Sequence, residues 1–107
     1  MKKYSVNITP HAEKVLSQVF EYIAFELLEP VYAANHLKRL QDGILSLDIF
    51  PTRCKVFSNK LYPGQELRRL LVDNFSIFYF VDEDQVMITD ILYSRSDIIM
   101  RLQSQYQ

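Results

Sequence analysis

Three apolar runs in the second half of the chain constrain the fold most strongly. They cover residues 67–72, 75–81 and 86–93, and only Asp73-Asn74 and residues 82–85 separate them. Separators this short and polar are typical of hairpin turns, so the runs predict an antiparallel meander. The middle run is apolar at almost every position, which indicates a central strand with a neighbour on each side.

An N-terminal strand and a helical hairpin are expected before the meander. Residues 4–9 alternate apolar and polar side chains, as a half-buried strand does. Thr9 and Pro10 suit a helix start, because the threonine hydroxyl can cap free amides and proline needs no donor there. Apolar residues then recur at helical spacing to about Leu28, and again from Pro30 to Leu47.

Together these elements predict an α+β fold in a single domain over residues 1–107. The antiparallel helical hairpin packs on one face of an antiparallel sheet of about four strands, and a short helix over residues 96–102 ends the chain. Residues 52–62 carry no clear pattern and are interpreted only as extended or loop. The second face of the sheet is left uncovered by helices.

Composition narrows the classes of function. Twelve Lys and Arg against thirteen Asp and Glu give a net charge of -1, so the chain as a whole does not attract nucleic acid. The lone cysteine, Cys54, suits a reducing compartment, and the N-terminus lacks the apolar run of a signal peptide or membrane span. A cytoplasmic protein without membrane contact is expected. Metal-ligand spacing and glycine-rich phosphate loops are also missing, so the sequence predicts neither a metal nor a cofactor.

Arginine on the predicted strands is the unusual chemical feature. If the apolar residues of the first run face the helices, alternation puts Arg69 on the open face, where Tyr93 and Arg95 can lie beside it. Guanidinium groups beside aromatic rings can bind phosphates and stack on bases. Arg68 then points toward the helices, where Asp90 can neutralise it. Packing of the arginines on the sheet is an equally good interpretation.

Five segments, taken in order, resemble the RelE/ParE toxin superfamily over nearly the whole chain. The resemblance rests on Ile8-Thr9-Pro10-His11-Ala12, Ile44 to Pro51, Leu67 to Val72, Phe78 to Asp82, and Ile88 to Asp97. It implies the toxin of a type II toxin-antitoxin system, of the kind that stabilises plasmids and inhibits growth. It also implies a cognate antitoxin as partner, in a toxin-antitoxin hetero-oligomer.

The resemblance implies one of two activities. ParE-like members bind and inhibit DNA gyrase, whereas RelE-like members are metal-independent endoribonucleases that cut messenger RNA in the ribosome. For the second activity, Arg69 matches a basic residue on the family's second strand and Arg95 matches the arginine after its last strand. Tyr93 would then transfer the proton, which makes Arg69, Tyr93 and Arg95 the candidate catalytic residues.

Two departures from the ribonuclease pattern favour the gyrase-binding activity. Residues 74–76 lack an arginine that many members carry, and residues 93–97 lack a histidine and a second arginine. A toxin that docks on ribosomal RNA would usually be strongly basic, and this chain is not. The ribonuclease remains as an alternative, and so does a non-toxic module that only binds an antitoxin.

Overall fold

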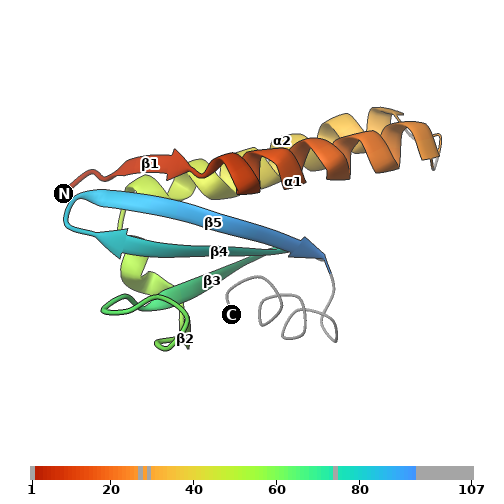
Figure 1. Ribbon diagram of the computed structural model, residues 1–107. Coiled ribbons are helices and arrows are strands. Elements are labelled where there is room, and N and C mark those ends of the chain that lie inside the picture. Colours follow the sequence, from red (N-terminus) through yellow and green to blue (C-terminus); the bar gives the residue numbers. More distant parts are fainter. Residues whose placement is uncertain (1, 27, 29, 74, 94–107) are drawn as a thin grey trace.

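A helical hairpin lies on one face of a five-stranded sheet in the computed structural model (Figure 1). The structure describes residues 2–26, 28, 30–73 and 75–93. The elements follow in the order β1 (Ser5–Ile8), α1 (Pro10–Glu21), the π-helical turn η1 (Tyr22–Glu26), α2 (Pro30–Leu45), the short 3-10 turns η2 (Ser46–Asp48) and η3 (Pro51–Arg53), β2 (Val56–Ser58), β3 (Leu67–Val72), β4 (Phe75–Asp82) and β5 (Gln85–Tyr93).

The strands lie in the order β1-β5-β4-β3-β2. β3, β4 and β5 form the predicted antiparallel meander, and β4 is its central strand. The sheet is mixed rather than wholly antiparallel, because β1 runs parallel to β5, from the pair Ser5 with Gln85 to the pair Ile8 with Ile88. The alternation in β1 indicated a strand with one buried face, but it carried no information on the direction of its partner.

β2 is the fifth strand, in the stretch that the sequence left as extended or loop. It has three residues and pairs antiparallel with β3, with an irregular register between Val56 and Ser58. A strand this short shows too few positions for a period of two to stand out. The predicted C-terminal helix, at residues 96–102, lies outside the described residues.

Both helices begin where the sequence predicts. The Thr9 hydroxyl accepts a hydrogen bond from the Ala12 amide at 3.2 Å, and Pro10 is the first residue of α1. Pro30 is likewise the first residue of α2. The predicted helix to about Leu28 is α-helical only to Glu21, where the π-helical turn follows. Within the described residues, the structure contains no helix with the length and apolar character that crossing a membrane requires.

The main core lies between the hairpin and the sheet. Large apolar side chains fill it from both helices and from the three meander strands; the buried ones include Leu16, Leu40, Ile44, Ile77, Tyr79, Ile88 and Ile91. α2 approaches β3 so closely that a Cβ on Gly43 would lie 2.7 Å from Val72 Cγ2. Tyr79 donates its hydroxyl to the Pro51 carbonyl at 2.6 Å, and burial raises the pKa of that hydroxyl above its ordinary value.

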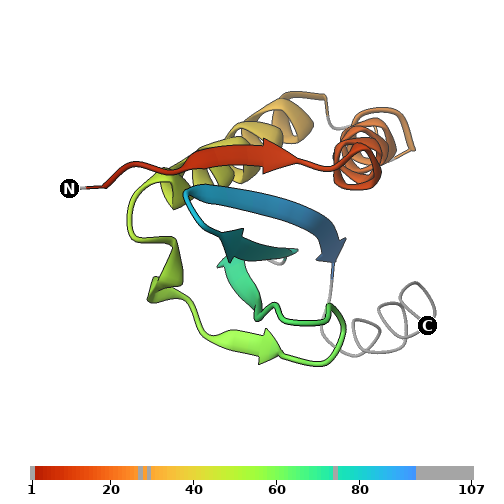
Figure 2. The same ribbon diagram turned by 60° about the vertical axis from the view of Figure 1, so that its left-hand side comes forward.

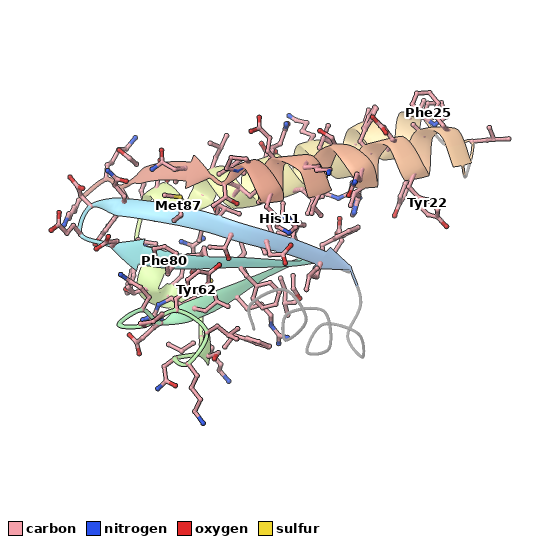
Figure 3. The ribbon with its side chains drawn as sticks, in the orientation of Figure 1. His11, Tyr22, Phe25, Tyr62, Phe80 and Met87 are labelled. Atoms are coloured by element: carbon pink, nitrogen blue, oxygen red, sulfur yellow. The ribbon has the colours of Figure 1, made fainter. Side chains whose placement is uncertain are left out.

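A second, smaller core lies on the face without helices, here called the open face. Leu67, Phe78 and Leu92 are buried there, under side chains from β2 and the segment that follows it. Tyr62 of that segment packs on Phe80 of β4, with 5.4 Å between ring centroids (Figure 3). Figure 2 shows the hairpin beside β1 and places β2 at the opposite edge of the sheet. The open face is therefore partly covered by the chain itself.

Candidate functional site

Arg69 lies on the open face. Leu70 and Val72, its neighbours along β3, pack into the main core beneath the helices. The Arg69 guanidinium carbon is 5.6 Å from the centroid of the Phe57 ring on β2. Phe57 meets Phe78 edge-on, with 4.9 Å between the ring centroids. A cation-π contact therefore holds Arg69 over Phe57, which packs edge-to-face with Phe78.

A hollow of about 370 Å³ opens beside Arg69. Lys55 lines it as well, so two cationic side chains border one small space. Among the ion pairs of the described residues, none joins a carboxylate to Arg69. The remaining lining residues are Cys54, Val56, Phe57, Leu70 and Leu71. Such a hollow can accept an anionic group next to an aromatic ring.

A β-bulge in β5 changes which residues face the helices. The pairing with β4 runs to Ile88 and resumes at Asp90, so Thr89 is an extra residue. An extra residue reverses the alternation beyond it, which turns Asp90 to the open face. Asp90 is fully buried there, and its Oδ1 lies 3.2 Å from His11 Nε2. The predicted contact between Arg68 and Asp90 is wrong, because Arg68 donates instead to two backbone carbonyls before β2, at 2.7 and 3.2 Å.

For the other two predicted site residues, the structure describes only the backbone of Tyr93. Tyr93 is the last residue of β5 and pairs with Phe75, while its side chain and the whole of Arg95 lie outside the described residues. Because of the bulge, alternation alone no longer assigns Tyr93 to the face of Arg69. The structure thus brings Arg69 together with Lys55 and Phe57, and its grouping with Tyr93 and Arg95 stays a prediction.

His36 is buried where α2 meets the turn between β3 and β4. Its ring packs between Tyr32 and Phe75, at centroid distances of 5.7 and 4.8 Å. Its Nδ1 lies 3.0 Å from Asp73 Oδ2, and Arg39 Nε donates to the same oxygen at 2.7 Å. The hydrogen bond from Arg39 lowers the pKa of the Asp73 carboxyl. His36 is accordingly a packing residue that ties the helix to the turn.

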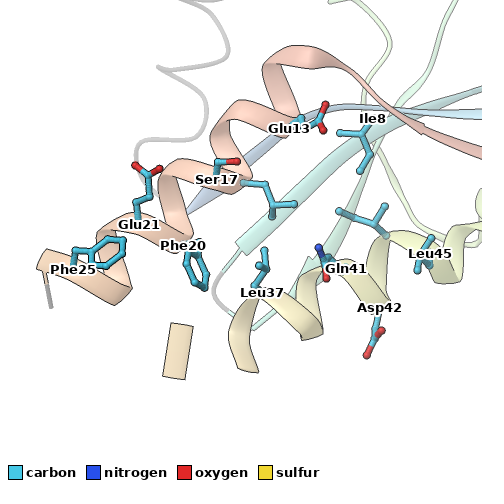
Figure 4. Close-up of a pocket in the computed structure, with 12 residues that line it drawn as sticks. Ile8, Glu13, Ser17, Phe20, Glu21, Phe25, Leu37, Gln41, Asp42 and Leu45 are labelled. Carbon is cyan, nitrogen blue, oxygen red and sulfur yellow. The ribbon is translucent and has the colours of Figure 1, made fainter. Parts of the chain in front are cut away.

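An interhelical groove of about 770 Å³ runs along the hairpin between α1 and α2 (Figure 4). Its floor is apolar, with Phe20 from α1 and Leu37 from α2 facing each other across it. All of the charged side chains that line it are carboxylates, from Glu13, Glu21 and Asp42. The groove thus combines an apolar floor with an acidic border.

The far end of the hairpin carries a group of exposed apolar side chains. We call it the hairpin-tip patch; its members, which expose between 53% and 79% of their surface, are Tyr22, Phe25, Leu28, Val31 and Tyr32. The tip extends past the end of the sheet (Figure 1), and Tyr22 and Phe25 point away from α1 on opposite sides (Figure 3). Exposed apolar groups of this kind mark binding surfaces.

Comparison with known proteins identifies the family. The sequence model of the ParE toxin of the type II toxin-antitoxin system, parDE, matches residues 6–98. The chain belongs to this family. No curated protein sequence matches it.

Two solved structures share the ParE-family fold of this chain. The chromosomal ParDE toxin-antitoxin system from P. aeruginosa has a chain that is 18% identical, with a TM-score of 0.73 over 89% of this chain and 100% of that chain. The archaeal RelE-RelB complex from Pyrococcus horikoshii OT3 has one that is 16% identical, with a TM-score of 0.59 over 87% of this chain and 96% of that chain. At these identities, the likeness is one of fold.

Sequence reasoning missed two features of this ParE-family chain. Lys55 and Phe57, which border Arg69, lie in the stretch that had no clear pattern. The hairpin-tip patch was not predicted, because helical periodicity identifies only the buried stripe of each helix. A signal was nevertheless present, since Tyr22, Phe25 and Val31 are large apolar residues that fall outside both stripes.

Proposed function

We propose that this ParE-family toxin inhibits bacterial growth by binding DNA gyrase. The observation that carries the proposal is the concentration of exposed apolar side chains on the helical hairpin, in the groove and at the tip. Apolar and aromatic surface of this kind binds other proteins. Inhibition through a protein contact needs no catalytic group, and a net charge of -1 is no obstacle to it.

The proposal includes a cognate antitoxin that silences the toxin. The interhelical groove is a suitable binding site for the antitoxin, because its apolar floor can bury the apolar face of a helix or extended segment. Its bordering carboxylates, from Glu13, Glu21 and Asp42, favour basic side chains on that segment. The proposed antitoxin segment is therefore amphipathic and basic, and a hetero-oligomer of toxin and antitoxin follows.

Expression of the chain without an antitoxin in a bacterial host tests the activity. We expect growth arrest with altered plasmid supercoiling, and inhibition of purified gyrase by the purified chain. Arg69→Ala serves as a matched control, because it removes the cation of the open face and leaves the hairpin unchanged. Arrest with normal supercoiling and newly cut messenger RNA would contradict the proposal.

A ribosome-dependent ribonuclease is the second candidate, and one observation favours it. Arg69 and Lys55 border a single hollow beside an aromatic ring, where a phosphate and a base can bind together. In this case Arg69 and Arg95 would hold the phosphate and Tyr93 would transfer the proton. Arg69→Ala with Arg95→Ala should then abolish cleavage of messenger RNA on ribosomes, and full cleavage by that variant would rule out these roles.

A third outcome of the same expression experiment is unimpaired growth with folded protein. That result would identify the chain as a binding module that keeps the fold and the antitoxin contact without toxicity. It differs from the gyrase inhibitor in leaving supercoiling normal, and from the ribonuclease in leaving messenger RNA intact.

A further inference from the structure

We propose that the hairpin-tip patch is the surface through which this toxin contacts gyrase, and that it docks on a basic, DNA-binding face of that enzyme. The inference rests on the proposed function and names the surfaces that meet. Neither the family match nor the structural neighbours assign a role to these residues. Packing, composition and charge support the assignment independently.

Among the described side chains at the tip, small residues are buried and large apolar residues are exposed, which is the reverse of what folding alone favours. Among the residues that the structure describes at this end, Ala24 and Ala33 are buried where the two helices meet, with Val19 and Phe20 partly buried beside them. The large apolar side chains of the hairpin-tip patch lie outside this small core. Apolar groups that are exposed to this degree add little to the stability of the monomer, so a binding role accounts for their position.

The composition of the patch is that of a protein interface. It contains Tyr22, Phe25 and Tyr32, and aromatic residues are enriched among the side chains that dominate binding energies. A tyrosine buries a large apolar ring while its hydroxyl keeps a hydrogen-bonding partner, which suits a surface that is wet before binding. A projecting tip also reaches a concave site more easily than the flat sheet does.

The charge of the segment that contains the tip indicates the kind of protein that the tip can bind. Between Lys14 and Lys38 the sequence contains three glutamates, Glu21, Glu26 and Glu29, and neither lysine nor arginine. An apolar tip in an acidic segment is repelled by acidic proteins and attracted to basic ones. An enzyme that holds duplex DNA must present a basic surface along the DNA path. Gyrase therefore offers the complementary charge.

The tip and the groove share one residue. Phe25 belongs to the hairpin-tip patch and also lines the interhelical groove, whereas Leu28, Val31 and Tyr32 do not line the groove. An antitoxin segment in the groove would consequently cover part of the tip and exclude gyrase. Because Leu28 and Val31 do not line the groove, they can be substituted without changing the groove.

The test measures binding of the full chain to purified gyrase, together with inhibition of supercoiling. Leu28→Ser with Val31→Ser is expected to weaken binding roughly tenfold or more, as loss of central interface side chains does. Tyr22→Ser, in the π-helical turn η1, should weaken binding independently. Phe50→Ser removes an exposed apolar group that lies outside the tip, the groove and the hollow beside Arg69, and it should leave binding unchanged. Higher salt should weaken binding by the parent chain, because opposite charges are screened.

The outcomes separate the two proposals. If the parent chain neither binds nor inhibits gyrase, the proposed function fails, and this assignment fails with it. If the parent inhibits gyrase and both tip variants do so equally well, only the assignment of the tip is overturned. Equal loss in the Phe50→Ser control would also overturn it. Thermal unfolding of each variant verifies folding, and Tyr22→Ser decides alone if the double variant is unfolded.

Discussion

The two halves of the helical hairpin place their apolar side chains in opposite ways. In the half over the sheet, large residues point inward, and Leu16, Leu40 and Ile44 are buried. In the half beyond the sheet, Ala24 and Ala33 lie inside while the large residues of the hairpin-tip patch lie outside. The two helices therefore contribute apolar side chains to the core at one end of the hairpin and expose them at the other end.

The difference shows where the free energy of folding originates. Burying one large apolar side chain contributes about 1.5–3 kcal/mol, so the half over the sheet carries most of the hairpin's share of stability. The far half gains little from burial and depends on the continuity of its helices with the anchored half. Its apolar groups are available to a partner, and substitutions should affect stability and binding in different halves.

The largest expected effect comes from Leu40 in the buried half. Leu40→Ala should lower the free energy of unfolding by about 2–5 kcal/mol, because it opens a cavity under the helices. Leu28→Ala makes the same chemical change at the exposed tip and should alter stability by less than about 0.5 kcal/mol. Urea unfolding measures both. Similar losses in the two variants would show that the halves do not differ.

A smaller effect is expected where the core contains a polar contact. Tyr79→Phe removes the hydroxyl that donates to the Pro51 carbonyl and should reduce stability by about 1–3 kcal/mol, because a buried acceptor loses its donor. Tyr4→Phe is a control, since it removes the same hydroxyl from a partly buried ring that packs against the main core. A loss as large in the control would mean that burial of the Tyr79 contact is not its cause.

Much of the fold followed from the sequence because its signals are local and repeated. The meander shows long apolar runs with polar turns between them, and both helix starts carry a proline at the first helical position. The parallel pairing of β1 and the existence of β2 could not be predicted. Strand direction depends on contacts between residues about eighty positions apart, and β2 has only three residues.

The candidate site was less predictable because one inserted residue changes it. Strict alternation along β5 puts Asp90 on the same face as Val86 and Ile88, but the bulge at Thr89 turns it to the face of Phe78, where its Oδ1 lies 3.2 Å from Nε2 of His11 at the start of α1. Nothing in the local sequence marks that bulge. Arg69 could be assigned to its face because β3 pairs with β4 without interruption, from Arg68 to Val72.

Acid should weaken the contact that ties the anchored half of α2 to the sheet. Asp73 has its pKa lowered by Arg39, so the unfolded chain binds a proton more readily than the folded chain does. The contribution of this group is complete above its ordinary pKa of about 3.9 and is lost as the pH falls through the lower, folded value.

Asp73→Asn keeps a residue that tolerates the positive φ of 54° at this turn and removes the titrating carboxyl. Its stability should consequently fall less steeply than that of the parent between neutral pH and strong acid. Glu83→Gln, in the exposed turn between β4 and β5, changes the net charge equally and serves as the control. If the stability of the parent and that of Asp73→Asn fall equally with decreasing pH, the contact between Arg39 and Asp73 does not contribute to stability.

The smallest expected change in stability belongs to the tip itself, and it is also the most discriminating. Val31 exposes 75% of its surface, so Val31→Ser removes almost no buried apolar area and should change the free energy of unfolding by less than about 0.5 kcal/mol. The same substitution should raise the solubility of the isolated chain, because it reduces a patch that promotes association. Measured together, unchanged unfolding and higher solubility would assign the tip to binding. A loss above about 1 kcal/mol would instead mean that Val31 packs in the folded monomer, and the contrast between the two halves would then be wrong.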